Sequence, residues 1–184
     1  AGLFNLGLWK QASESYKEYF AEHPRHQLAD HGHFGLGLCY FNLKDYASAA
    51  VELDKASKGK GPDRTETNLY LGQALLLKTP PSPKSAEDAF KSGLIALGFE
   101  RSGILKRSWN QKSITAWVEK NKDAKKRSLG VDVFVGLVEA SYLRNDWSSL
   151  VEKVSAFEKV FEGSKVEQRV RVLSGAAYVE LENY

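Results

Sequence analysis

Four histidines are the first residues of this 184-residue chain that suggest chemistry, because His23, His26, His31 and His33 fall within eleven residues. Imidazole nitrogens are common zinc ligands, so such a cluster suggests a metal site. His31 and His33 are two residues apart, however, and would project about 200° apart around a helix, whereas a helical zinc pair needs i, i+3 or i, i+4 spacing. No cysteine or carboxylate pair completes a ligand shell. We therefore expect no metal and no cofactor.

Motifs for catalysis are missing from the sequence as well. It contains no G-x-S-x-G, H-E-x-x-H or phosphate-binding loop, and Gly35-x-Gly37 falls inside an expected helix instead of between a strand and a helix. The single cysteine, Cys39, lies in an apolar stretch, which indicates a small buried thiol. We expect a non-enzymatic protein. The alternative that stays open is a regulatory or substrate-recruiting module of a larger enzyme.

The segment 99–128 is the strongest candidate for binding an anionic partner. It holds nine Lys/Arg against three Asp/Glu, a net charge of +6 in a chain whose total is +3. Nucleic acid bound by such charges would dissociate as salt rises, and tryptophans could stack on bases. Ile114, Trp117 and Val118 nevertheless follow helical i, i+3, i+4 spacing, so a solvated charged face over a packed helix is favoured over nucleic-acid binding. The candidate contacts are Lys106, Arg107, Lys112 and Trp117.

Helical periodicity runs through almost the whole chain, so helices must position the histidines and the basic residues named above. Strands find little support, and no run of about 18 apolar residues could span a bilayer, so we expect no membrane insertion. The expected helices are 2–7, 9–22, 28–43, 46–58, 65–78, 84–97, 108–122, 130–144, 147–162 and 165–182.

Small residues recur at similar positions in successive helices. Leu36-Gly37-x-x-Tyr40 is followed by Ala49-x-x-x-Leu53, and Leu71-Gly72-x-x-Leu75 and Ser174-Gly175-x-x-Tyr178 repeat the first part of the pattern. A glycine inside a helix costs about 1 kcal/mol relative to alanine. We therefore expect a closely approaching neighbour helix at Gly37, Gly72 and Gly175.

This spacing resembles that of tetratricopeptide repeats, which are helix-turn-helix units of about 34 residues. The resemblance implies an all-α fold, a right-handed superhelical array of antiparallel helix pairs forming one continuous solenoid. Repeats would occupy 1–98, with the first truncated, and 129–184, with the last truncated. Between them, 99–128 would form an irregular basic helical insertion.

The resemblance also implies a concave groove lined by the first helix of each pair. A mainly apolar groove suits an amphipathic helix or an extended apolar segment, so we expect a protein–protein interaction scaffold with a protein or peptide partner. A carboxylate clamp is not expected, since Phe34, Leu38 and Leu69 stand where such clamps have Lys and Asn. The alternative that flanking helices of the array fill the groove stays open. The residues expected to face it are Phe34, Leu38, Phe41, Asn42, Leu69, Gln73, Leu76 and Leu77.

A narrower resemblance concerns residues 9–56. Ala12-x-x-x-Tyr16-x-x-Tyr19-Phe20, His23-Pro24 and Leu36-Gly37-Leu38-Cys39-Tyr40 are similar to repeats of bacterial envelope proteins that coordinate division with the Tol-Pal system or support outer-membrane protein assembly. This resemblance implies the periplasm or cell envelope. It indicates a repeat subtype, and it names no partner.

Overall fold

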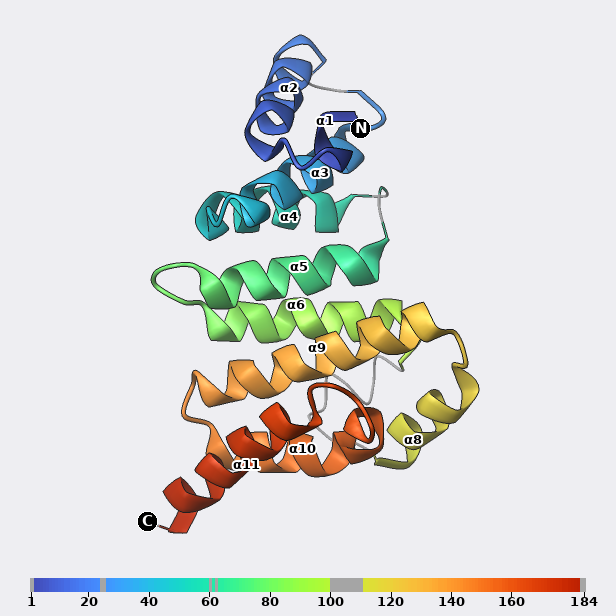
Figure 1. Ribbon diagram of the computed structural model, residues 1–184, viewed down its shortest axis with the longest axis vertical. Coiled ribbons are helices and arrows are strands. Elements are labelled where there is room, and N and C mark those ends of the chain that lie inside the picture. Colours follow the sequence, from blue (N-terminus) through green and yellow to red (C-terminus); the bar gives the residue numbers. More distant parts are fainter. Residues whose placement is uncertain (1, 24–25, 60, 62, 100–110, 183–184) are drawn as a thin grey trace. The chain divides into compact units, whose positions relative to one another are not determined.

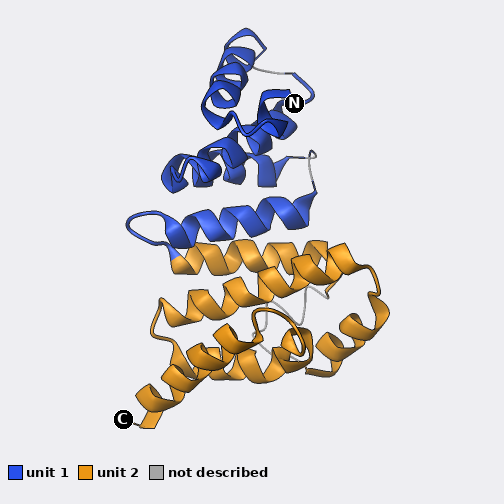
Figure 2. Ribbon diagram, viewed as in Figure 1, with its two compact units in different colours: residues 1–82 blue, residues 83–184 orange. Residues whose placement is uncertain are grey.

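The structure is a computed structural model that describes residues 2–23, 26–59, 61, 63–99 and 111–182. Within these ranges every regular element is an α-helix, so the predicted all-α class is confirmed. The chain divides into two compact units, residues 1–82 and residues 83–184 (Figure 2). The boundary falls inside the segment 1–98 that the sequence assigned to one group of repeats.

The helix bounds match the expected ranges to within a few residues, except at the start of α9. This helix begins at Ala124 instead of 130, because the Asp123 carboxylate accepts a hydrogen bond from the Lys126 N–H at 2.9 Å and caps it. Unit 1 contains α1 (Gly2–Asn5), α2 (Trp9–Glu22), α3 (Ala29–Asn42), α4 (Tyr46–Lys58) and α5 (Arg64–Leu77) (Figure 1). Unit 2 contains α6 (Pro83–Ala96), α8 (Gln111–Lys120), α9 (Ala124–Tyr142), α10 (Trp147–Phe161) and α11 (Glu167–Glu182).

Helices that follow one another in unit 1 also pack against one another. α2 contacts α3, α3 contacts α4, α4 contacts α5, and α3 additionally reaches α5. Gly37 makes the α3–α4 contact close, because a Cβ at this position would lie 2.7 Å from Leu53 Cγ and 3.2 Å from the Leu53 backbone nitrogen. Leu53 is fully buried there, together with Cys39 and Ala49. The predicted packing reason for Gly37 is therefore confirmed.

Two aromatic rings of α2 lie on glycines of α3. A Cβ on Gly32 would come within 2.9 Å of the Phe20 ring, and one on Gly35 would overlap the phenol of Tyr16. Because glycine has no side chain, both rings can lie directly against the backbone of α3. The α2–α3 contact is therefore made by large residues on one helix and the bare backbone of the other.

Unit 2 repeats this kind of contact. α6 packs against α9, and a Cβ on Gly136 of α9 would overlap the ring of Phe90 from α6. α9 then packs against α10 and α10 against α11, while α8 contacts α10. Phe90, Phe134 and Phe157 are fully buried, with 4.1 Å between the ring centroids of Phe134 and Phe157. These rings form the centre of the unit.

The same turn joins α3 to α4 and α9 to α10. Lys44 and Asn145 adopt positive φ angles of 63° and 55°, and in each case the next residue is an aspartate. The carboxylates of Asp45 and Asp146 accept hydrogen bonds from the N–H three residues ahead, at 3.1 and 3.3 Å, and so cap the helix that follows. Each unit therefore contains one copy of this turn.

An aromatic pair flanks each copy of the turn. Phe41 and Tyr46 meet edge to face with ring centroids 5.4 Å apart, and Tyr142 and Trp147 do so at 5.5 Å. The two turns thus agree in backbone conformation, cap and side-chain packing.

The other two repeat glycines differ from each other. Gly72 is buried in α5, as expected for a position of close packing. Gly175 is exposed on α11, and a Cβ built on it would meet no described atom within 4 Å other than its chain neighbours and the backbone of its own helix. The neighbour helix expected at Gly175 is therefore not found in this part of the chain.

None of the described helices is both long enough and apolar enough to cross a bilayer.

Candidate functional site

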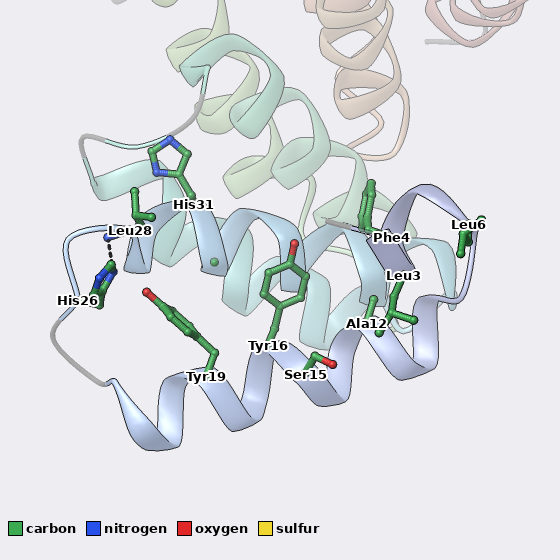
Figure 3. A pocket seen from close by; sticks show the side chains of 12 residues that line it. Leu3, Phe4, Leu6, Ala12, Ser15, Tyr16, Tyr19, His26, Leu28 and His31 are labelled. Carbon is green, nitrogen blue, oxygen red and sulfur yellow. Dashed lines mark hydrogen bonds between the residues drawn. The ribbon is translucent and has the colours of Figure 1, made fainter.

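Unit 1 contains an open cavity of about 720 Å³ between α1, α2 and the start of α3 (Figure 3). Its volume lies within the range of roughly 300–1,000 Å³ that is typical of ligand pockets. The cavity is lined by Gly2, Leu3, Phe4, Leu6, Ala12, Ser15, Tyr16, Tyr19, His26, Leu28, His31 and Gly32.

One end of this cavity is apolar. Leu3 of α1 lies beside Ala12 of α2, and Phe4 and Leu6 line the same end from α1 and the turn after it (Figure 3). Leu6 leaves 74% of its surface exposed, and Leu28 at the other end leaves 49%. Apolar surface gathered around a concave site is typical of a binding surface, whereas single exposed leucines are ordinary.

The opposite end carries hydrogen-bonding groups. Tyr19 projects from α2 toward His26 and Leu28, and His31 lies beside them on α3 (Figure 3). The Tyr19 hydroxyl is buried, and it has no hydrogen-bond partner among the described residues. The Leu28 N–H donates to His26 Nδ1 at 3.2 Å, which in the neutral ring leaves the proton on Nε2. Since the lining contains no Asp or Glu, this end offers donors and no negative charge.

Tyr16 lies between the two ends. Its hydroxyl is the group that a side chain at Gly35 would displace. Burial, and secondarily the nearby Cys39, raise the pKa of the Tyr16 phenol. The phenol therefore stays protonated at neutral pH and can donate a hydrogen bond.

The eight residues predicted to face a concave groove are distributed over different environments. On α3, Phe34, Leu38 and Phe41 are half-buried, and Asn42 is exposed. On α5, Leu69 and Leu76 are buried, Gln73 is half-buried and Leu77 is exposed.

Two of these residues, predicted to face a groove, instead make contacts within unit 1. The Phe41 ring meets Tyr46 and Tyr70 edge to face, with centroids 5.4 and 5.2 Å away. The Asn42 side-chain amide donates to the Leu38 carbonyl oxygen of its own helix at 2.8 Å. Phe41 is therefore part of the α3–α4–α5 packing, and one amide hydrogen of Asn42 is already used.

The basic candidates are only partly described. Lys106 and Arg107 lie outside the described residues, and Lys112 is exposed near the start of α8. Trp117 is 8% exposed, its Nε1–H donates to the Leu97 carbonyl oxygen at 3.1 Å, and its ring covers Gly130. The Trp117 ring is therefore enclosed in unit 2 and has no free face for stacking on a base.

The histidines take separate positions in unit 1. His33 Nδ1 lies 2.7 Å from a carboxylate oxygen of Glu52, and the His33 ring stacks on Phe20. Across the part of the chain that the structure describes, no three His, Cys, Asp or Glu side chains come together in a group that could hold a metal ion. Burial raises the pKa of the Cys39 thiol to about 11, so this cysteine is not an activated nucleophile.

A buried ion network lies in unit 2, between α6, α9 and α10. The Lys153 ammonium donates to the hydroxyls of Ser141 and Ser149 at 2.5 and 2.8 Å, and it lies 3.4 Å from Glu87 Oε1. The Lys153 side chain is only 1% exposed. Its position between three oxygens explains how a lysine is accommodated in this core, and leaves it out of reach of a substrate.

Two further cations surround Glu87. Lys91 Nζ lies 2.9 Å from Glu87 Oε1, and Arg144 Nη1 lies 2.5 Å from Oε2. Burial acts to raise the pKa of the Glu87 carboxyl, but the hydrogen bond from Lys91 and the charges of Lys153 and Arg144 outweigh it and lower this pKa below its usual value. The network holds α6, α9 and α10 together.

A second hollow, of about 560 Å³, lies between α10 and α11. Its rim is charged, and several of these charges pair with one another: Arg171 with Glu167 at 2.6 Å and Lys159 with Glu162 at 3.1 Å. Because four of the five charged side chains that line it are paired with one another, this hollow offers less to a ligand than the cavity of unit 1.

Sequence reasoning missed the cavity of unit 1 and the ion network of unit 2. The residues of α1 carry no repeat motif, and Tyr19 was recognised only as part of the repeat rhythm. Phe90 could have been found, since Ala86-x-x-x-Phe90 has the same spacing as Ala12-x-x-x-Tyr16.

Comparison of the chain with protein-family models, with curated proteins and with solved structures found no match.

Proposed function

We propose that unit 1 is a non-enzymatic protein-interaction module that binds an amphipathic helix in the cavity between α1, α2 and α3. The observation that carries this proposal is the cavity itself, a concave, mainly apolar site of about 720 Å³ with Leu6 and Leu28 exposed on its lining. Helix-in-groove recognition buries the apolar stripe of a helix in such a site.

The packing of α3 supports a helix as the occupant. α3 contacts both α4 and α5, which also contact each other, so that three helices share one core. α2 and α3 are likewise in contact, but the third position beside them holds only the four residues of α1. A helix placed there would bury the apolar surface of α2 and α3 as α3 buries that of α4 and α5.

The predicted α3–α5 groove is a less favourable site for the same function. Leu69 and Leu76 are already buried, and Phe41 packs on two tyrosines. An incoming helix would find little uncovered apolar surface on these residues. Of the eight predicted positions, Leu77 offers the largest exposed apolar side chain, at 51%.

The other two candidate functions have weaker support. A recruiting module of a larger enzyme would bind its partner through the same cavity. The experiment below therefore tests the binding step of that alternative as well. Anionic binding through the basic segment loses Trp117 as a stacking residue, since the Trp117 ring is enclosed.

A selection from a displayed peptide library tests the proposal. The library consists of 14-residue helices, the length of α3, with apolar residues at i, i+3, i+4 and i+7 and all other positions randomised. The full chain should enrich a family of helices. Leu6→Glu should weaken their binding at least tenfold, because it places a charge on the apolar end of the cavity.

Val51→Glu is the matched control, since Val51 is also exposed, at 55%, and lies on α4 away from the cavity. This variant should bind the selected helices as the unchanged chain does. A library that yields no helix, or helices that bind the Leu6→Glu and Val51→Glu variants equally well, would contradict the proposal.

A further inference from the structure

We infer that the helix bound in this cavity carries an acidic side chain, and that the Tyr19 hydroxyl selects it. The inference rests on the proposed function and adds the chemistry of the partner. It comes from the polar end of the cavity, where Tyr19, His26 and His31 lie (Figure 3).

The Tyr19 hydroxyl is the group in this cavity that most needs a partner. It is buried, and no described residue forms a hydrogen bond with it. A buried polar group without a partner destabilises a protein, because the group has lost its hydrogen bonds to water. A ligand that accepts a hydrogen bond from Tyr19 would remove this cost on binding.

The surroundings of Tyr19 favour a carboxylate as that acceptor. His26 accepts the Leu28 N–H through Nδ1, so its Nε2 carries a hydrogen that can be donated. The His26 ring lies against Tyr19, with 5.7 Å between ring centroids, whereas His23 faces the carboxylate of Glu22 at 3.9 Å and does not line the cavity. No Asp or Glu lines the cavity, so nothing in the lining repels a negative charge.

The apolar end of the same cavity determines which other side chains the partner needs. Leu3, Phe4 and Leu6 accept apolar side chains at one end, while Tyr19 lies at the other. The partner is therefore an amphipathic helix with an apolar stripe and with Asp or Glu in the turn that lies over Tyr19. The partner's acidic residue sets its orientation as well as its affinity, since only one direction places the carboxylate on Tyr19.

The test uses the library selection with two baits, the unchanged chain and Tyr19→Phe. The phenylalanine variant keeps the ring on α2 and removes only the hydroxyl. The unchanged chain should enrich Asp or Glu in one terminal turn of the selected helices, and the Tyr19→Phe bait should not.

A double-mutant cycle then measures the contact with the best selected helix. Replacing its acidic residue by Gln or Asn should weaken binding to the unchanged chain roughly tenfold or more, as for a hydrogen bond to a charged group. The same replacement should change binding to Tyr19→Phe by less than about threefold. The Tyr19→Phe chain should keep its affinity for helices that lack the acidic residue, which shows that the cavity is still formed.

The outcomes separate this inference from the proposed function. Helices that bind the cavity and lose affinity with Leu6→Glu, but that show no acidic enrichment and no coupling to Tyr19, would contradict the inference and leave the proposed function standing. A selection that yields no helix at all contradicts both. Enrichment that stays the same with the Tyr19→Phe bait would also overturn the inference.

Discussion

At the scale of single residues, glycines decide how closely the helices of each unit approach. The missing side chain of Gly37 leaves room for Leu53. In the same way Gly35 leaves room for Tyr16, and Gly136 for Phe90. In each case a large side chain of one helix fills the space that a Cβ would occupy on the next. The cost of glycine in a helix is offset by the surface that this contact buries.

Gly37→Leu should lower the free energy of unfolding by at least about 2 kcal/mol, through overpacking. The Leu53 backbone nitrogen lies 3.2 Å from the position of the new Cβ, so a rotamer change of Leu53 alone cannot make room and α4 has to move. Urea denaturation of the variant and of the unchanged chain measures this difference.

Gly175→Ala is the control for this prediction, because Gly175 is helical with open space around it. It should leave stability unchanged or raise it by up to about 1 kcal/mol, as expected for replacing an exposed helical glycine. Equal stability of Gly37→Leu and the unchanged chain would contradict the close α3–α4 contact.

Glu87 should make unit 2 sensitive to acid. Its pKa is lowered in the folded chain, so its stabilising contribution is complete above the pKa of an unfolded glutamate, about 4.3, and is lost as the pH falls through the folded value. Glu87→Gln should cost about 3–5 kcal/mol at pH 7, because it removes the carboxylate charge that is paired with the buried Lys153 ammonium.

Urea denaturation at a series of pH values between 7 and 3 tests this account. The stability difference between the unchanged chain and Glu87→Gln should shrink as the pH falls, since protonation removes the charge that the substitution removes. A difference that stays constant over this range would show that the carboxylate charge of Glu87 does not stabilise the network.

At the scale of elements, the capped turn that occurs in both units was partly visible in the sequence. Both turns fall between expected helices, 28–43 and 46–58 in one case and 130–144 and 147–162 in the other, and helical spacing gave most helix bounds to within a few residues. These features are local, since a helix end depends on a cap and on the period of its apolar residues. The start of α9 was misplaced because Asp123 lies among lysines that carry no repeat spacing.

The contacts between elements could be predicted much less well. Periodicity shows which side chains share a face, and it does not show which helix covers that face. Trp117, Leu69 and Leu76 were given as candidate contacts for partners, and all three are buried. The pairing of Lys153 with Glu87 joins residues 66 positions apart, which no local spacing reveals.

Asp45→Ala should destabilise unit 1 by about 1 kcal/mol through loss of the α4 cap. The carboxylate of Asp45 accepts the Ser48 N–H at 3.1 Å, and alanine leaves this donor without its side-chain acceptor. Asp45→Asn keeps an acceptor oxygen and should cost only a few tenths of a kcal/mol. If the thermal melts of Asp45→Ala and Asp45→Asn coincide, this cap contributes nothing to stability.

At the scale of the whole molecule, the two units share one way of packing and differ in what they leave uncovered. Each has a turn with a positive-φ residue and a capping aspartate, and each seats an aromatic ring on a glycine. Unit 2 buries a charged network, whereas unit 1 has an apolar cavity beside a short helix. We therefore assign the proposed binding function to unit 1 and derive the expected chemistry of the partner from α1, α2 and α3.

Hydrogen exchange of the full chain, with and without a saturating amount of a selected helix, shows where the helix binds. We expect added protection of backbone amides in α1, α2 and the first half of α3, with α10 and α11 unchanged. Protection that falls instead on α5 around Gln73 and Leu77, or on unit 2 alone, would contradict the proposal, because the helix would then bind elsewhere than in the cavity.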